Sequence, residues 1–244
     1  MNTTSASHAE TPAHAPPGRK ILVWDAPVRV FHALMVLSFA GAWLSAESER
    51  WRLLHVTLGY TVAALVAFRI VWGLVGTRHA RFTNFVRGPA AVAAHLRSMR
   101  RGRPEHHTGH NPTGTLAILA LLSLAAATAA TGWAGFNELG GEWLKELHEG
   151  AASLMLGVVG VHVAGVLIGS WLERQNLVLG MINGRKDGPP QDAIRSAWRS
   201  VAVLMVAAVL SFWWLQWQGA PAGGAMADVA AVSKPVKTHD RHAR

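Results

Sequence analysis

Apolar residues dominate five stretches of the chain, each close to the roughly 20 residues that an α-helix needs to cross a bilayer. The five stretches are Pro27 to Ala46, Leu53 to Val75, Pro112 to Ala134, Glu149 to Leu172 and Trp198 to Trp217. The first four pack most naturally into a bundle, and the fifth follows them. The pattern therefore predicts an all-α integral membrane protein, with a four-helix transmembrane bundle and a fifth, C-terminal transmembrane helix.

The two ends of the chain differ from these stretches in composition. Residues 1–20 are rich in Thr, Ser, Ala and Pro and have no apolar periodicity, and residues 218–244 have the composition of a flexible tail. We expect both segments to be disordered. Between them we expect the four-helix bundle at residues 21–184, followed by a linker and the fifth helix at residues 185–217.

The composition supports a lipid environment. Hydrophobic residues make up 50% of the chain and charged residues 15%, below the roughly 25% charged residues usual in soluble domains. The 11 tryptophans suit membrane interfaces, where an indole ring can lie at the level of the headgroups. A net charge of +9 could also indicate nucleic-acid binding. Because the basic residues lie between apolar runs and form no single stripe, we expect membrane lipid as a partner and no nucleic acid.

The chain contains no cysteine. This excludes disulfides, iron–sulfur clusters held by thiolates, zinc sites built on Cys and covalent attachment of haem. Any metal chemistry must therefore use His, Met, carboxylates or backbone groups.

The positions of Lys and Arg predict the orientation in the membrane. These residues concentrate in three segments that the positive-inside rule assigns to the cytoplasm. They are Arg19, Lys20 and Arg29; Arg78, Arg81, Arg87, Arg97, Arg100, Arg101 and Arg103; and Arg174, Arg185, Lys186 and Arg195. The connections on the opposite side are acidic or balanced. We therefore expect a multi-pass protein with its N-terminus in the cytoplasm.

Four of the 13 histidines lie within or at the ends of the apolar stretches: His32, His55, His148 and His162. The 14 residues from His148 to His162 correspond to about 21 Å of helix, and the two side chains share one face to within about 40°. The alternating direction of the spans puts His32 at the depth of His162, and His55 at the depth of His148. Two imidazoles on facing helices at equal depth are what a bis-histidine iron porphyrin requires. The sequence therefore predicts two non-covalent b haems, with axial pairs His32/His162 and His55/His148.

Basic residues stand three positions before three of these histidines. They are Arg29 before His32, Arg52 before His55 and Lys145 before His148. Residues at i and i+3 share a helix face, so each cation could bind a haem propionate near the membrane surface. Ordinary snorkelling of the side chain to the interface is an equally good explanation.

Two further residues share the faces that carry the histidines. Arg69 follows His55 by 14 residues and therefore projects at the depth of the inner pair. We expect it to balance a propionate charge or to bind a quinone oxygen, the alternative being snorkelling to the cytoplasmic interface. Met155 lies midway between His148 and His162, where its thioether could ligate haem, but packing between the two cofactors is the favoured interpretation.

Four stretches of the sequence together resemble the prokaryotic cytochrome b561 family, which includes the cytochrome b subunits of nickel–iron hydrogenases. The stretches are VWDAPVRVFHALMVLSFAGAW, LLHVTLGYTVAALVAFRIVWGLVGTRHARFTNF, GHNPTG and ELHEGAASLMLGVVGVHV, and the resemblance covers roughly Trp24 to Gly184. It implies a four-helix protein of the bacterial inner membrane that holds two b haems, with axial ligands at His32, His55, His148 and His162. It also implies electron exchange between the quinone pool and a partner such as a hydrogenase, a periplasmic cytochrome c or another oxidoreductase.

We therefore expect a dihaem electron carrier that moves electrons across the membrane, with a quinone bound near one haem. Whether the protein is also an enzyme depends on whether it oxidises or reduces quinone itself. The alternative is a transition-metal permease in which the histidines line a metal path. That alternative predicts carboxylates or further polar residues between the two histidine levels, and the spans contain few of them.

Overall fold

The computed structural model describes residues 19–86 and 112–219, together with the single positions 88, 90, 93, 94, 97 and 109. Within this part of the chain, five helices are long and apolar enough to cross a membrane. They are α1 (Ala26–Ser45), α2 (Arg52–Val75), α5 (Pro112–Phe136), α6 (Glu142–Leu172) and α8 (Arg199–Gln218). The all-α membrane fold and the five spans that the sequence predicts are confirmed.

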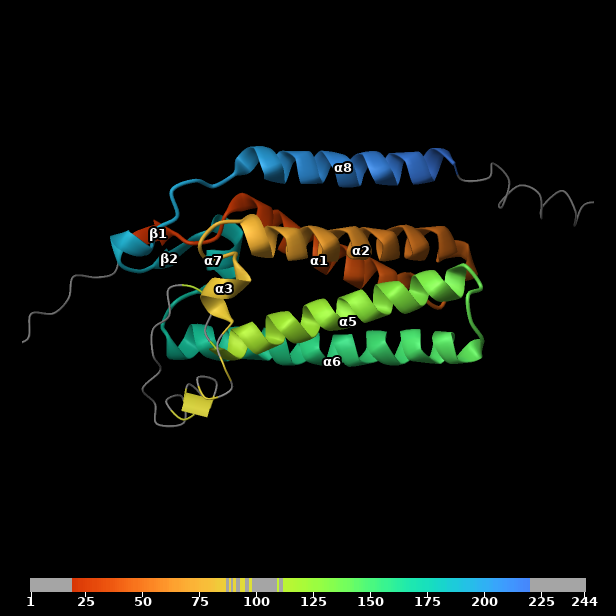
Figure 1. Ribbon diagram of the computed structural model, residues 1–244, viewed down its shortest axis with the longest axis horizontal. Helices are drawn as coiled ribbons and strands as arrows, with labels where there is room; N and C mark the ends of the chain where they lie inside the picture. The colour runs from red at the N-terminus through yellow and green to blue at the C-terminus, as the bar shows by residue number, and fades with distance from the viewer. Residues whose placement is uncertain are drawn as a thin grey trace, which may run out of the picture.

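The first four long helices form an up-and-down bundle, and the fifth covers one side of it (Figure 1). Helix α6 packs along α5, α5 also packs against α2, and α2 packs against α1. Helix α8 lies against α1 and, more lightly, against α2. The bundle therefore has one side shielded by α8 and the opposite side, formed by α5 and α6, turned outward (Figure 1).

Helix α6 begins at Glu142, which is earlier than the apolar stretch predicts. The segment from Glu142 to Glu149 is polar, but it consists mostly of good helix formers such as Glu, Leu and Lys, so the helix continues beyond the apolar region. Leu144 in this segment is buried. As a result His148 lies about two turns inside the helix, in a fully formed part of it.

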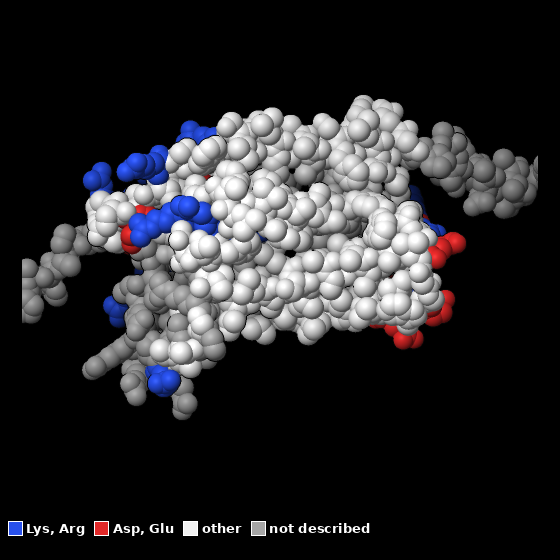
Figure 2. All heavy atoms as spheres, in the orientation of Figure 1, with Lys and Arg blue, Asp and Glu red and all other residues white. Residues whose placement is uncertain are grey.

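Charged side chains gather at the two ends of the bundle, while its middle is almost free of them (Figure 2). One end, where α1 begins and α6 ends, carries Arg19, Lys20, Arg78, Arg174 and Arg185, and we call it the basic end. The other, called the acidic end, carries Glu47, Glu49, Glu138, Glu142 and Glu146. Large apolar side chains between the ends are exposed, including Leu37, Leu74, Val161 and Leu204. This arrangement is the one that a bilayer requires of a spanning protein.

Short elements complete the basic end. Strand β1 (Lys20–Leu22) pairs antiparallel with β2 (Arg185–Asp187), with Ile21 opposite Lys186, so the fold adds two strands that the sequence did not predict. Helix α7 (Leu177–Asn183) precedes β2. The remaining short elements are η1 (Glu49–Trp51), α3 (Phe82–Phe85) and η2 (Pro190–Asp192).

The turn between α7 and β2 depends on Gly184. Its φ of 81° lies in the left-handed region, which glycine adopts at little cost. The carbonyl oxygen of Gly184 accepts hydrogen bonds from Val23 N at 2.8 Å and Trp24 N at 3.0 Å. The boundary that the sequence predicts between the bundle and the linker lies at residues 184 and 185, and β2 begins there. By pairing with β1, strand β2 joins the linker to the segment that precedes α1.

Lys186 is buried in this small sheet, with 7% of its surface exposed. Burial lowers the pKa of its ammonium group, and the nearby Glu173 carboxylate acts in the opposite direction. Burial thus disfavours the charged form of this side chain, and the Glu173 carboxylate favours it.

Asp25 joins the start of α1 to the end of α2. It is fully buried, and its Oδ1 accepts a hydrogen bond from Val28 N at 2.8 Å, which caps α1. Its Oδ2 accepts hydrogen bonds from Trp72 Nε1 at 3.1 Å and Thr77 Oγ1 at 2.6 Å. Arg69 of α2 interacts electrostatically with the same carboxylate. These contacts fix the depth of α1 relative to α2.

Helix α8 is tied to the bundle by packing and by a hydrogen bond. Met205 packs in a buried cluster with Phe31 of α1 and Leu65 of α2. Further along the helix, Trp213 Nε1 donates a hydrogen bond to Thr61 Oγ1 at 2.9 Å. Inside a membrane such a bond removes the cost of leaving an indole N–H unpaired.

The expected disordered tails lie almost entirely outside the described residues, which begin at residue 19 and end at residue 219. Lys20, the last residue of the expected N-terminal tail, starts β1. Gln218, the first of the expected C-terminal tail, ends α8.

We predict that Asp25→Ala lowers the free energy of unfolding by roughly 2–4 kcal/mol, because it removes a helix cap and leaves buried donors of Trp72 and Thr77 without an acceptor. Unfolding of the purified protein by a denaturing detergent measures this change.

The matched control is Asp187→Ala. Asp187 forms a partly exposed salt bridge with Lys20 at 2.9 Å, and surface pairs of this kind contribute less than about 1 kcal/mol. Equal destabilisation by the two substitutions would show that Asp25 does not hold the two helices together.

Candidate functional site

Two histidines face each other near the acidic end of the bundle. His55 lies in the first turn of α2 and His148 in the second turn of α6. Their ring centres are 6.1 Å apart, and the ring planes meet at 75°. Two metal–imidazole bonds of about 2.0 Å on opposite sides of one ion, plus the ring radii, give a separation of roughly 6 Å. We call these residues the acidic-end pair.

Backbone carbonyls of the neighbouring helices hold both rings of the acidic-end pair. His55 Nδ1 lies 2.8 Å from the carbonyl oxygen of Ala42 in α1. His148 Nδ1 lies 2.9 Å from that of Thr128 in α5. A carbonyl can only accept, so each Nδ1 carries the proton and donates it. Each Nε2 is then left with a lone pair, which is the form that binds metal.

Gly132 makes room for the ring of His148. A Cβ added at this position would lie 2.8 Å from His148 Cε1 and 2.9 Å from its Nδ1, closer than a methyl group can approach. Gly132 follows Thr128 by one helical turn, so both residues present the same face to α6. The absent side chain therefore allows the imidazole to reach the Thr128 carbonyl.

The second pair lies near the basic end. His32 is in the second turn of α1 and His162 is ten residues from the end of α6. The two side chains are half-buried and interact electrostatically with each other. Neither ring is hydrogen bonded to any other described residue. We call these residues the basic-end pair. The structure thus places each of these histidines near the partner that depth counting gives it, and haem ligation by the two pairs stays a prediction.

An apolar layer separates the two pairs. Met155 is buried, with 3% of its surface exposed, and clusters with Val62 and Val66 of α2 and Ala125 of α5. Its side chain is enclosed by apolar groups, so the packing role that the sequence favours for Met155 is the one its contacts support.

Several features of the described residues fit a flat cofactor at each pair. Helix α6 does not pack closely against α1 or α2, the helices that carry the partner histidines. The facing histidines therefore lie on helices that are not close neighbours in the bundle. Gly59 lies one turn after His55 and is half-buried, and a Cβ added there would meet no atom within 4 Å. A half-buried glycine beside open space is a position where a planar ring could lie against the helix.

At the depth of each histidine pair, a buried polar atom has no hydrogen-bond partner within the described residues. Arg29 Nε is one, three residues before His32, and Thr128 Oγ1 is another, on the residue whose carbonyl holds His148. A buried polar group left without a partner costs roughly 1–3 kcal/mol. A propionate accepting from Arg29 would remove that cost. The residues present therefore fit a haem at each pair.

The four basic residues selected from the sequence lie in different surroundings. Arg29 is half-buried and its guanidinium donates to the carbonyl oxygen of Ile182. Arg69 is buried, with 3% of its surface exposed, and its guanidinium carbon lies 4.8 Å from the centre of the Phe82 ring. Arg52 and Lys145 are exposed, and Arg52 lies 4.0 Å from Glu49. Arg69 is thus enclosed by the protein, Arg29 is partly enclosed, and Arg52 and Lys145 lie on the surface.

Sequence reasoning missed three groups that position the histidines. The buried Asp25, the carbonyl acceptors in α1 and α5, and Gly132 depend on contacts between different helices, which the spacing along one helix does not reveal. One signal was available for Asp25, since an Asp directly before Ala-Pro is a typical helix N-cap.

The remaining histidines contribute no further pair to the described residues. His79 Nε2 lies 2.8 Å from the carbonyl oxygen of Asp192, outside the spans. The others, His8, His14, His95, His106, His107, His110, His239 and His242, lie outside the described part. Across the described positions, no three His, Asp or Glu side chains gather as a metal site.

Comparison with known proteins gives one match. A family model for prokaryotic cytochrome b561 matches residues 23–184, whereas no curated protein and no solved structure matches the chain. The matched region contains α1, α2, α5 and α6 with both histidine pairs, and α8 lies beyond it. The chain therefore belongs to the prokaryotic cytochrome b561 family, and it is a multi-pass protein of the inner membrane that binds haem b and transfers electrons.

Proposed function

We propose that the protein holds two b haems and carries electrons across the inner membrane between the quinone pool and a redox partner. The observation that carries this proposal is the geometry of the acidic-end pair, whose rings are 6.1 Å apart with each Nδ1 hydrogen bonded to a carbonyl. The second pair, at the depth that the sequence predicts, supports a second haem.

In this proposal the histidines are axial ligands, with His55 and His148 on one haem and His32 and His162 on the other. A bound haem supplies an iron that gains and loses one electron. The Ala42 and Thr128 carbonyls keep each Nε2 of the acidic-end pair deprotonated and aimed between the helices. The layer around Met155 keeps water out of the space between the two sites.

Basic residues act as counter-charges to the propionates in this proposal. Arg29 and Arg69 are the better supported, because Arg69 is buried and Arg29 is half-buried at the basic end. Arg52 and Lys145 lie on the surface at the acidic end, within reach of propionates that extend to the membrane surface.

The charge distribution supports a cytoplasmic N-terminus. By the positive-inside rule the basic end faces the cytoplasm, so the basic-end pair lies near the cytoplasm and the acidic-end pair near the periplasm. Haems held at the two pairs would place one redox centre near each membrane surface. A hydrogenase, a cytochrome c or another oxidoreductase is the partner, and quinone oxidation or reduction at one surface would make the protein an enzyme.

Substitution of the axial ligands tests the pairing. We predict that His55→Ala and His148→Ala each remove the same haem and halve the haem content, because one imidazole alone does not hold the ring. His32→Ala and His162→Ala should remove the other haem. Pyridine haemochrome assays give the haem content, and redox titration shows which haem remains.

His79→Ala is the matched control and should keep both haems, since His79 lies outside the spans. Loss of one haem upon His55→Ala but of the other upon His148→Ala would contradict the pairing.

We predict that Gly132→Ala weakens haem binding at the acidic-end pair by about 10–100-fold, the usual effect of disturbing a group that orients a metal ligand. The added methyl group would displace the His148 ring from the Thr128 carbonyl. Haem titration of the apoprotein measures the affinity. Gly135→Ala, in the same helix and with no atom within 4 Å of the added Cβ, should bind haem normally, and an equal loss there would show a general effect on α5.

Arg69→Gln should lower the midpoint potential of the basic-end haem by roughly 50 mV, because removing a nearby positive charge stabilises the more positive ferric state. Potentiometric titration of the purified protein measures both haems. Arg78→Gln, which removes an exposed partner of Asp192 at 3.2 Å, should leave both potentials unchanged. Unchanged potentials in Arg69→Gln would assign that residue to the Asp25 contact alone.

A further inference from the structure

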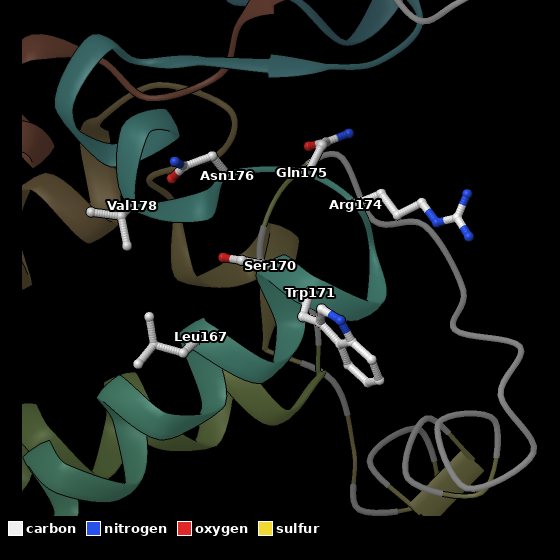
Figure 3. Close-up of a pocket in the computed structure, with 7 residues that line it drawn as sticks. All are labelled: Leu167, Ser170, Trp171, Arg174, Gln175, Asn176 and Val178. Carbon is white, nitrogen blue, oxygen red and sulfur yellow. The ribbon is translucent and has the colours of Figure 1, made fainter.

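A pocket of about 370 Å³ lies where α6 ends and α7 begins. It is lined by Leu167, Ser170, Trp171, Arg174, Gln175, Asn176 and Val178 (Figure 3). Leu167 of α6 and Val178 of α7 border the same space, with the Ser170 hydroxyl between them, while the Arg174 side chain extends outward from the turn (Figure 3). The pocket thus combines apolar walls with a cationic rim.

The pocket lies at the level of the membrane surface. The apolar part of α6 ends at Leu172, and Trp171 just before it is 78% exposed. Beyond the turn, α7 exposes the apolar side chains of Val178, Leu179 and Ile182. An indole at the end of a span and a short helix with exposed apolar residues are both typical of the headgroup region.

The pocket is turned away from the histidines. Trp171 follows His162 by nine residues, which is two and a half turns, so the two side chains lie on opposite faces of α6. Leu167 is displaced from His162 by about 140° around the helix. A ligand in the pocket therefore lies on the lipid-facing side of α6, away from the face that carries His162.

Arg174 occupies a backbone position that favours glycine. Its φ is 50°, in the left-handed region, and it follows the end of α6, where glycine is the usual residue. The local hydrogen bonds do not use its side chain: Arg174 N donates to the carbonyl oxygen of Trp171, and Gln175 N to that of Ser170. Within the described residues the guanidinium forms no salt bridge.

Two other polar side chains of the pocket, Ser170 and Asn176, already form hydrogen bonds with the backbone. Ser170 Oγ donates to the carbonyl oxygen of Val166 at 2.7 Å and accepts from Leu177 N at 3.2 Å. Asn176 Oδ1 accepts from Leu179 N at 2.8 Å, which leaves the Asn176 amide N–H groups as donors. Besides the Gln175 amide, the Arg174 guanidinium is still available at the rim of the pocket, and a guanidinium binds phosphate strongly.

We propose that this pocket binds one anionic phospholipid from the leaflet at the basic end. Arg174, at the outer rim of the pocket, binds the headgroup phosphate, and the acyl chains lie along Leu167 and Trp171. The apolar walls beside the cation favour a lipid over free phosphate, because a free ion would leave them uncovered. The site is independent of the haems, so its test does not depend on the proposed electron transfer.

The test counts the phospholipids retained by the full-length protein. Wild-type protein and variants are reconstituted in vesicles of phosphatidylcholine with one fifth phosphatidylglycerol, released into mild detergent and analysed by native mass spectrometry. Wild type should retain phosphatidylglycerol in preference to phosphatidylcholine. Arg174→Gly should lose that preference by about five-fold, the factor expected for one basic residue at an anionic lipid surface. Because glycine suits this backbone position, the variant should fold at least as well as wild type.

Arg195→Gly, which removes another exposed cation at the basic end, is the matched control and should bind lipid like wild type. Equal retention of phosphatidylglycerol by wild type and Arg174→Gly would overturn the proposal. So would displacement of the bound lipid from wild type by millimolar inorganic phosphate, since that result would identify a free-phosphate site.

Discussion

An imidazole inside a bilayer has two ring nitrogens, and both need partners there. In the acidic-end pair the helix next to each histidine satisfies one of them, through the carbonyls of Ala42 and Thr128. The second nitrogen of each ring is thereby left with a lone pair, and the two ring centres lie 6.1 Å apart. Because a carbonyl oxygen can only accept, the bond also selects the tautomer that binds iron. The rest of the bundle depends on this constraint, since α1 and α5 must lie at a depth where their carbonyls meet the rings.

The depth of the helices is fixed at the basic end. The buried Asp25 caps α1 and binds Trp72 and Thr77 at the end of α2, so the first helix cannot slide along the second. His32 lies two turns above this contact, and Ala42 lies near the other end of the same helix. One buried carboxylate thus positions a ligand of the basic-end pair and the acceptor for a ligand of the acidic-end pair. Helix α8 adds packing from outside, through Met205 and Trp213.

The sequence predicted the five spans because apolar runs of membrane length have few other interpretations. It also predicted which histidines lie at equal depth, because depth on antiparallel helices follows from the rise per residue. It did not predict Gly132 or the carbonyl acceptors, whose roles depend on the rotation of one helix against its neighbour. Spacing along the helix predicted the same role for Arg52 and Arg69, because it gives the face and the depth of a side chain but not its exposure. In the structure Arg52 is exposed and Arg69 is buried. The pairing of β1 with β2 joins segments more than 160 residues apart, which no local pattern indicates.

The central claim is that each histidine pair holds one haem. The most direct measurement is the ratio of haem b to polypeptide in the purified wild-type protein, by pyridine haemochrome assay and amino-acid analysis, after expression with haem in excess. The account predicts two haems per chain, both low-spin in the oxidised protein, as bis-histidine ligation requires. A ratio of one haem per chain, or a high-spin signal from half of the iron, would contradict it.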